Sequence, residues 1–168
     1  MQASERYMTI DHSDFGPFYD EDSRILILGS FPSVKSREAK FYYGHPQNRF
    51  WKIIPAVFNE EAELDTLEKK KNFLKAHHIA LWDAIEKCDI IGSSDASIRN
   101  VVPTDLNSIL KDSHIERIFV NGKTSEKYFN KYQNLTGRTA ITLPSSSPAN
   151  AAYSLERLIC EWKRLISS

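Results

Sequence analysis

The sequence has only two cysteines, Cys88 and Cys160, and no apolar run long enough to span a membrane. Two thiols cannot supply a four-cysteine zinc or iron–sulfur site, and they do not form a disulfide-rich framework. We expect both cysteines to be reduced and buried, as free cysteines generally are. The first residues, MQASERYMTIDHSDF, lack the apolar segment of a signal peptide, so we expect a cytoplasmic protein with no membrane partner.

An excess of positive charge is also missing, because 22 Lys and Arg residues balance 22 Asp and Glu residues. Proteins that bind nucleic acid without sequence preference usually carry surplus basic residues. Any contact with nucleic acid must therefore depend on a local patch. The chain has 168 residues, 41% of them hydrophobic, and shows no linker or low-complexity stretch. These values predict a single domain over residues 1–168.

Four short apolar segments, each followed by small or polar residues, predict buried strands of a parallel sheet. They are RILILGS (24–30), HIALWD (78–83), ERIFVNG (116–122) and TAITLPS (139–145). Helical patterns lie between and after them, at 63–78, 104–112, 123–132 and 148–166. The alternation predicts an α/β fold with a mainly parallel sheet.

Polar residues follow every predicted strand, and several of them suit helix starts. Thr104 is the expected N-cap of the 104–112 helix, Ser147 that of the last helix, and Pro148 fits the first position of that helix. Asp83 is expected to cap a helix after the second strand. Ligands bind beyond the carboxyl ends of parallel strands. We therefore expect the segments that follow the four strands, at 29–33, 83, 121–123 and 144–148, to converge on one face of the molecule.

The stretch FYYGHPQNRFW (41–51) places a polar tripeptide among aromatic rings. Pro46 can begin a helix that continues through Trp51 to Ile54, which puts Asn48 in the first turn. Asn48 then either caps this helix or serves a ligand: its carbonyl oxygen can hold a water molecule, and its carboxamide can complement an amide-like edge. Tyr42 and Tyr43 either line a pocket or pack beneath it.

Three motifs, in this order and on these elements, resemble the uracil-DNA glycosylase superfamily and, within it, the hypoxanthine-DNA glycosylase family. They are GSFPS (29–33), YYGHPQNRFW (42–51) and LPSSSPAN (143–150). Similarity from about residue 15 onward is added by LWD (81–83), GSSDASIRNVVPTDL (92–106) and VNGKTSEKYF (120–129). The resemblance implies a three-layer α/β sandwich around a central four-stranded sheet.

The resemblance also implies a catalytic role for Asn48. Phe31 stands where other superfamily members carry an Asp or Asn that activates water. The resemblance therefore assigns the water-positioning role to Asn48 and makes Phe31 a wall or stacking surface of the pocket. Asn121 resembles the base-reading asparagine, although Asn121-Gly122 can equally be a simple turn. The implied base-binding residues are Ser30, Phe31, Tyr43, His45 and Asn121, with a capping role as the alternative for His45.

The loop 144–150 resembles the motif that enters the minor groove beside the extruded nucleotide. Hydroxyl groups and a helix start can bind phosphates without adding net charge. The implied DNA-binding residues are Ser145, Ser146, Ser147, Pro148 and Asn150, together with Lys35 and Lys123. An ordinary capped helix start and isolated surface lysines are the alternatives.

Together these residues predict a monofunctional glycosylase, acting as a monomer without a metal or organic cofactor. It would flip a deaminated base, hypoxanthine first, out of duplex DNA and hydrolyse the bond at C1′. Three alternatives stay open: a uracil- or mismatch-directed glycosylase, a non-catalytic damaged-DNA-binding module, and a hydrolase or transferase of free nucleotides.

Overall fold

A four-stranded parallel sheet lies at the centre of the computed structural model, which describes residues 6–12, 15–133 and 136–167. The strands stand in the order β3-β2-β6-β7. Their bounds are β2 Ile25–Gly29, β3 Ile79–Asp83, β6 Arg117–Asn121 and β7 Ala140–Leu143. Each strand falls inside a predicted apolar segment, so the predicted α/β class with a mainly parallel sheet is confirmed.

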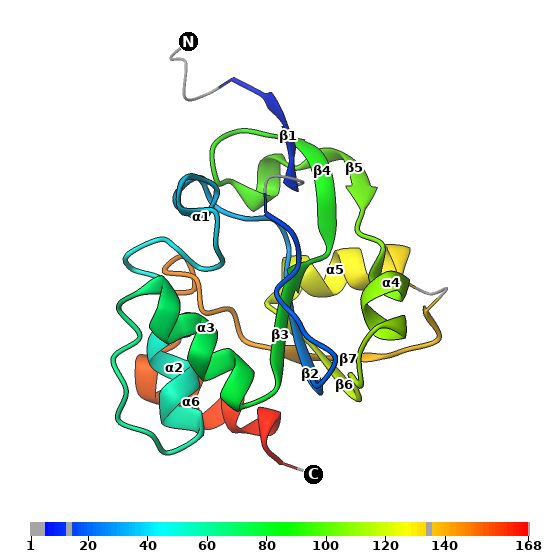
Figure 1. Ribbon diagram of the computed structural model, residues 1–168. Helices are drawn as coiled ribbons and strands as arrows, with labels where there is room; N and C mark the ends of the chain where they lie inside the picture. The colour runs from blue at the N-terminus through cyan, green and yellow to red at the C-terminus, as the bar shows by residue number, and fades with distance from the viewer. Residues whose placement is uncertain (1–5, 13–14, 134–135, 168) are drawn as a thin grey trace.

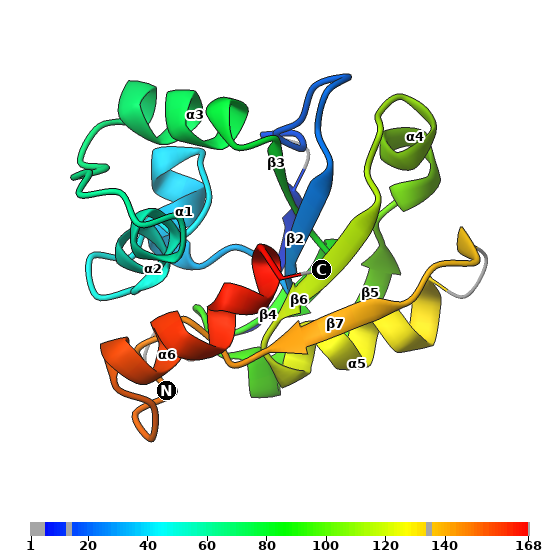
Figure 2. The same ribbon diagram turned by 90° about the horizontal axis from the view of Figure 1, so that it is seen from below.

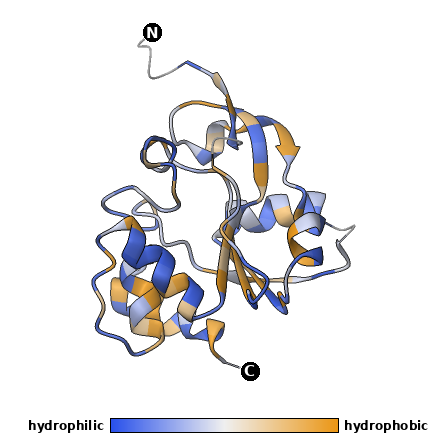
Figure 3. Ribbon diagram, viewed as in Figure 1, coloured by the Kyte–Doolittle hydropathy of each residue, from blue (hydrophilic) through white to orange (hydrophobic). Residues whose placement is uncertain are grey.

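Helices cover both faces of this sheet, which explains why its strands are apolar without alternation. On one face lie α1 (Val34–Ala39), α2 (Phe50–Val57), α3 (Leu67–Ala76) and α6 (Leu155–Trp162); on the other lie α4 (Leu106–Lys111) and α5 (Lys123–Tyr132) (Figures 1 and 2). The central residues of β2 are fully buried, and the strands of the sheet are mostly hydrophobic (Figure 3). The three-layer sandwich is confirmed.

A second, antiparallel sheet was not predicted. It has the order β1-β4-β5, with β1 at Met8–Asp11, β4 at Ile85–Ile90 and β5 at Arg99–Pro103. Only Ala84 separates β3 from β4, so the chain passes directly from one sheet into the other. The prediction that Asp83 caps a helix is therefore wrong, because a strand follows it. Short 3-10 helices occupy Asp95–Ser97 and Lys163–Leu165.

Two predicted helix starts are wrong. The last helix begins at Leu155 with Ser154 as its N-cap, and Ser147 and Pro148 lie in a preceding turn. Asp105, not Thr104, stands at the N-cap position of α4 and makes no side-chain capping bond there. The hydroxyl of Thr104 donates instead to the backbone oxygen of Asp83 (2.7 Å).

The predicted position of Asn48 inside a helix is also wrong. α2 begins at Phe50, with Arg49 as its N-cap. Asn48 instead precedes the helix and accepts a hydrogen bond from the backbone of Phe50. The segment from Pro46 to Asn48 lies outside the helix, and within it the backbone N–H of Asn48 donates to the backbone oxygen of His45 (2.9 Å).

The prediction of two buried cysteines holds for Cys88 and is wrong for Cys160, which is exposed. Cys160 lies on α6, an amphipathic helix that buries Leu158 and Trp162 on its other side. No helix in the described ranges is long and apolar enough to cross a membrane.

Candidate functional site

A cavity of about 320 Å³ opens at the carboxyl edge of the central sheet. Gly29, Asp83 and Asn121, the last residues of β2, β3 and β6, all line it, as does the segment 145–149 after β7. The predicted convergence of the strand ends is therefore confirmed. The turn after β2 and the segment before α2 complete the wall.

Most of the predicted site residues lie together in this cavity. Its lining includes Ser30, Phe31, Tyr43, His45, Asn48, Asn121, Ser145, Ser146, Ser147 and Pro148. Tyr42 also lines the cavity while its hydroxyl donates to the backbone oxygen of Gly16 (2.8 Å), so both tyrosines contribute to the pocket wall.

Three of the predicted DNA-binding residues lie outside the cavity lining. The side-chain amide of Asn150 donates to the backbone oxygen of Ser145 (3.0 Å) and so shapes the loop. Lys35 lies on α1, 3.6 Å from Glu38, and Lys123 is the exposed first residue of α5. These positions are compatible with contacts to a DNA backbone but not with contacts to a base inside the cavity.

Asn48 is held at the pocket wall by two hydrogen bonds to its carbonyl oxygen. The backbone N–H of Phe50 donates to Asn48 Oδ1 (2.9 Å), and the hydroxyl of Ser146 donates to the same atom (2.8 Å). A carbonyl oxygen has two lone pairs, so these bonds occupy the atom that the sequence suggested for holding water. The amide nitrogen of Asn48 has no acceptor among the residues described, and this leaves a donor group for the pocket.

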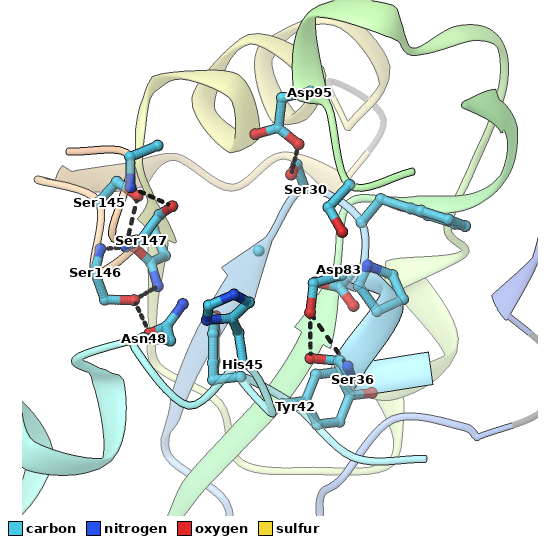
Figure 4. Close-up of a pocket in the computed structure, with 18 of the residues that line it drawn as sticks. Ser30, Ser36, Tyr42, His45, Asn48, Asp83, Asp95, Ser145, Ser146 and Ser147 are labelled. Carbon is cyan, nitrogen blue, oxygen red and sulfur yellow. Dashed lines mark hydrogen bonds between the residues drawn. The ribbon is translucent and has the colours of Figure 1, made fainter. Parts of the chain in front are cut away.

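Asn121 is bound to the same serine from the end of β6. Its Oδ1 accepts from the backbone N–H of Ser146 (3.0 Å), and its Nδ2 donates to the Ser146 hydroxyl (2.9 Å). One hydrogen on Nδ2 and one lone pair on Oδ1 remain available. Asn48, Asn121 and Ser146, which share these hydrogen bonds, form what we call the amide wall. Figure 4 shows Asn48 and Ser146 on the same side of the pocket as Ser145 and Ser147.

Arg49 fixes the loop after β7, a role that the sequence did not suggest. Its guanidinium donates to the backbone oxygens of Ser147 (2.7 Å), Asn150 (3.0 Å) and Tyr153, and its backbone N–H donates to that of Ser146 (3.1 Å). Four carbonyl groups of one loop thus converge on the residue next to Asn48. No short sequence spacing marks this contact, because the partners are about a hundred positions apart.

The opposite side of the pocket carries a buried carboxylate (Figure 4). Asp83 is 3% exposed, and its Oδ2 lies 2.5 Å from Nε2 of the buried His12. Burial lowers the pKa of His12, but the hydrogen bond and negative charge of Asp83 outweigh burial and leave that pKa raised. We call Asp83, with His12 behind it, the carboxylate wall. Sequence reasoning missed this pair because 71 residues separate its members.

The other carboxylate oxygen of Asp83 faces the end of β2. A Cβ atom at Gly29 would stand 2.5 Å from Asp83 Oδ1 and 3.4 Å from the hydroxyl of Tyr43. Only glycine therefore leaves room for this carboxylate. Burial, aided by the charge of Asp83, raises the pKa of Tyr43 and keeps its phenol neutral.

Phe31 and Ser30 lie where the two sheets meet. Phe31 is 8% exposed, packs with Ala84 and Ile85, and turns part of its ring to the cavity. The hydroxyl of Ser30 donates to Asp95 Oδ1 (3.2 Å). Desolvation raises the pKa of Asp95, and the hydrogen bond from Ser30 opposes that rise.

Comparisons with known proteins identify the family of this chain. Residues 17–166 match the family described as the Uracil DNA glycosylase superfamily. A protein named hypoxanthine DNA glycosylase from Methanosarcina barkeri is 35% identical over 140 residues, covering 81% of this chain and 86% of that protein. One of the same name from Methanosarcina acetivorans is 34% identical over 151 residues, covering 89% and 94%.

A solved structure shares the fold. The solution NMR structure of a candidate uracil DNA glycosylase from Methanosarcina acetivorans superposes with a TM-score of 0.75 at 30% identity, covering 91% of this chain and 97% of that one. The family match covers nearly the whole chain, and both relatives exceed 30% identity over most of their length. This chain belongs to the uracil DNA glycosylase superfamily.

Proposed function

We propose that this chain removes hypoxanthine from duplex DNA by hydrolysing the N-glycosyl bond. The observation that carries the proposal is the gathering of Asn48, Asn121 and Asp83 around one cavity at the carboxyl edge of the sheet. Two relatives named hypoxanthine DNA glycosylase support the choice of base. The cavity volume lies in the range of pockets that enclose small molecules.

The two walls together suit the edge of a deaminated purine. Hypoxanthine presents a carbonyl oxygen beside a ring N–H. The remaining hydrogen of Asn121 Nδ2 can donate to that oxygen, and the carboxylate of Asp83 can accept from the ring N–H. Adenine presents an amino group and an unprotonated ring nitrogen at these positions. The adenine amino group would then meet the donor Asn121 Nδ2, and the adenine ring nitrogen would meet the acceptor Asp83. Neither pair can form a hydrogen bond, so buried polar groups would stay unpaired.

Asn48 would position the attacking water. Glycosidic bonds break through a sugar with oxocarbenium character, so the water needs correct placement more than a strong base. A free amide hydrogen of Asn48 can donate to the water oxygen and leave its second lone pair for C1′. As the C1′–O bond forms and the C1′–N bond breaks, the proton that the water loses goes to the departing base. We assign Asn48 this role because its carbonyl oxygen is already bonded to Phe50 and Ser146.

The loop after β7 would contact the DNA beside the flipped nucleotide. Its carbonyl groups are turned inward to Arg49, and the hydroxyl oxygens of Ser145 and Ser147 accept from N–H groups of the loop, so the hydrogens of these two hydroxyls can donate to phosphate oxygens. Lys35 and Lys123 would add contacts to the backbone. Extrusion of the base costs a few kcal/mol and least at a mispair, which adds to selectivity. We expect the protein to act as a monomer, which gel filtration tests.

Single-turnover assays on matched duplexes test the proposal. Duplexes carrying one inosine, one uracil or no modified base are incubated with excess protein and then treated with alkali. We expect alkali-labile sites at inosine, with much slower cleavage at uracil and none in the unmodified duplex. Faster reaction at uracil would replace hypoxanthine by uracil as the substrate. Binding without alkali-labile product would indicate a damage-binding module instead.

A further inference from the structure

Three side chains in the pocket form a hydrogen-bonded chain whose direction is fixed at both ends. At one end the backbone N–H of Phe50 donates to Asn48 Oδ1, and at the other the backbone N–H of Ser146 donates to Asn121 Oδ1. A backbone amide nitrogen only donates. Each bond therefore establishes which end of the carboxamide is oxygen, an assignment that an isolated asparagine leaves open.

The direction of the middle of the chain follows from its ends. Because Oδ1 of Asn121 is fixed, its Nδ2 is the atom 2.9 Å from the Ser146 hydroxyl, and it donates to that oxygen. The hydroxyl hydrogen is then free to be donated to Asn48 Oδ1 at 2.8 Å. The sequence of donation is Asn121 to Ser146 to Asn48.

Ser146 is completely buried, so solvent cannot take its place easily. Its hydroxyl is the shared partner of two amides that come from different elements, one at the end of β6 and one before α2. The backbone of Ser146 adds to the constraint, since its N–H holds Asn121 and its carbonyl oxygen accepts from the backbone of Arg49.

We propose that Ser146 is a positioning residue that couples the water-holding amide of Asn48 to the base-contacting amide of Asn121. This inference rests on the proposed function and goes beyond a phosphate-binding role for the serine. In the chain of bonds, each donation strengthens the next one by polarisation. A base carbonyl that accepts from the second hydrogen of Asn121 Nδ2 holds that carboxamide in place, and the carboxamide in turn holds the Ser146 hydroxyl that donates to Asn48. Correct docking of the base is thereby linked to correct placement of the water.

A double-mutant cycle tests the coupling. We expect Ser146→Ala to lower the single-turnover rate on the inosine duplex by about tenfold or more, with duplex affinity changed less than about threefold, because a hydrogen bond is lost and an amide is released. In an Asn48→Ala background, the same substitution should change the rate by less than about threefold. Two results would overturn the proposal. One is a Ser146→Ala rate equal to that of the unsubstituted protein; the other is a double variant whose loss of rate equals the product of the losses in the two single variants.

Ser125→Ala provides the matched control. Ser125 is also fully buried, and its hydroxyl donates to the backbone oxygen of Leu28 (2.8 Å) outside the cavity lining. We expect it to lower the melting temperature without lowering the rate. If Ser146→Ala does not fold, Ser146→Cys replaces it with a weak donor of similar shape and should show the same loss of rate.

A spectroscopic readout separates this inference from the proposed function. Side-chain amide resonances of Asn48 and Asn121 can be followed in ¹⁵N-labelled protein without any substrate. We expect Ser146→Ala to shift both pairs of resonances and Ser125→Ala to shift neither. Unchanged resonances would overturn the coupling even in an active enzyme. Shifted resonances in a protein that releases no base would preserve the coupling and reject the glycosylase activity.

Discussion

The two walls of the pocket are built on opposite electrostatic principles. The amide wall is neutral, and three side chains share hydrogen bonds whose direction is set by backbone N–H groups. The carboxylate wall is a buried pair in which the hydrogen bond and the negative charge of Asp83 raise the pKa of His12. The side chains of the amide wall are oriented by hydrogen bonds from backbone N–H groups, whereas the interaction in the carboxylate wall depends on the protonation of His12. The comparison teaches that one pocket can combine a part insensitive to pH with a part that titrates.

Substitution of Asn48 should have the largest effect on activity. We expect Asn48→Ala to reduce the single-turnover rate on the inosine duplex by about 10²–10³-fold, the usual cost of losing a positioned polar group at a reacting centre. The melting temperature should also fall by several degrees, because the Phe50 N–H and the buried Ser146 hydroxyl lose their shared acceptor. A rate within twofold of the unsubstituted protein would remove Asn48 from the chemistry.

Removal of the Asp83 charge should weaken catalysis and alter the pH dependence of stability. We expect Asp83→Asn to slow excision about 10- to 100-fold, because a charged acceptor for the base N–H is lost. In the unsubstituted protein, the raised pKa of His12 contributes stability that is fully present below pH 6.5 and is lost as the pH rises through that raised pKa. Urea unfolding between pH 5.5 and 9 should show this decline, and Asp83→Asn should flatten it. An identical decline in both proteins would contradict the pairing.

A methyl group at Gly29 should displace the same carboxylate without changing any charge. Because the new Cβ would lie 2.5 Å from Asp83 Oδ1, we expect Gly29→Ala to cost about 1–3 kcal/mol of stability and to slow excision about tenfold. Gly16→Ala is the matched control, since nothing lies within 4 Å of its Cβ position. Equal behaviour of the two variants in urea unfolding and single-turnover assays would show that Asp83 tolerates displacement.

Loss of the Arg49 guanidinium should have the smallest effect on chemistry. We expect Arg49→Met to leave several loop carbonyls without their donor and to lower stability by about 1–3 kcal/mol. Affinity for the inosine duplex should fall several-fold, and the rate at saturation should fall less than that. Lys52→Met, an exposed cation on α2, should change neither quantity. Limited proteolysis of the 147–153 loop gives an independent measure of its order.

The sequence predicted the central sheet well because its strands are buried on both faces and appear as unbroken apolar runs. It did not reveal the second sheet, because β4 and β5 have alternating or mostly exposed residues. Ser147 and Pro148 have the residue types of a helix start, yet the Ser147 carbonyl oxygen accepts from Arg49 and no helix follows until Leu155. The order of the motifs predicted Asn48 and Asn121 as site residues. The hydrogen bonds of Ser146 to both of them and the His12–Asp83 pair could not be predicted, because they join residues far apart in the sequence.

The inward-facing guanidinium of Arg49 affects how strongly DNA binding by this protein should depend on salt. A cation that is committed to loop carbonyls does not neutralise phosphates, so it releases no condensed counterions when DNA binds. Hydroxyl and N–H contacts release none either. Counterion release would then come from cations such as Lys35 and Lys123 alone, so association should respond only modestly to ionic strength. Lesion recognition should persist in salt that strips basic glycosylases from undamaged duplex.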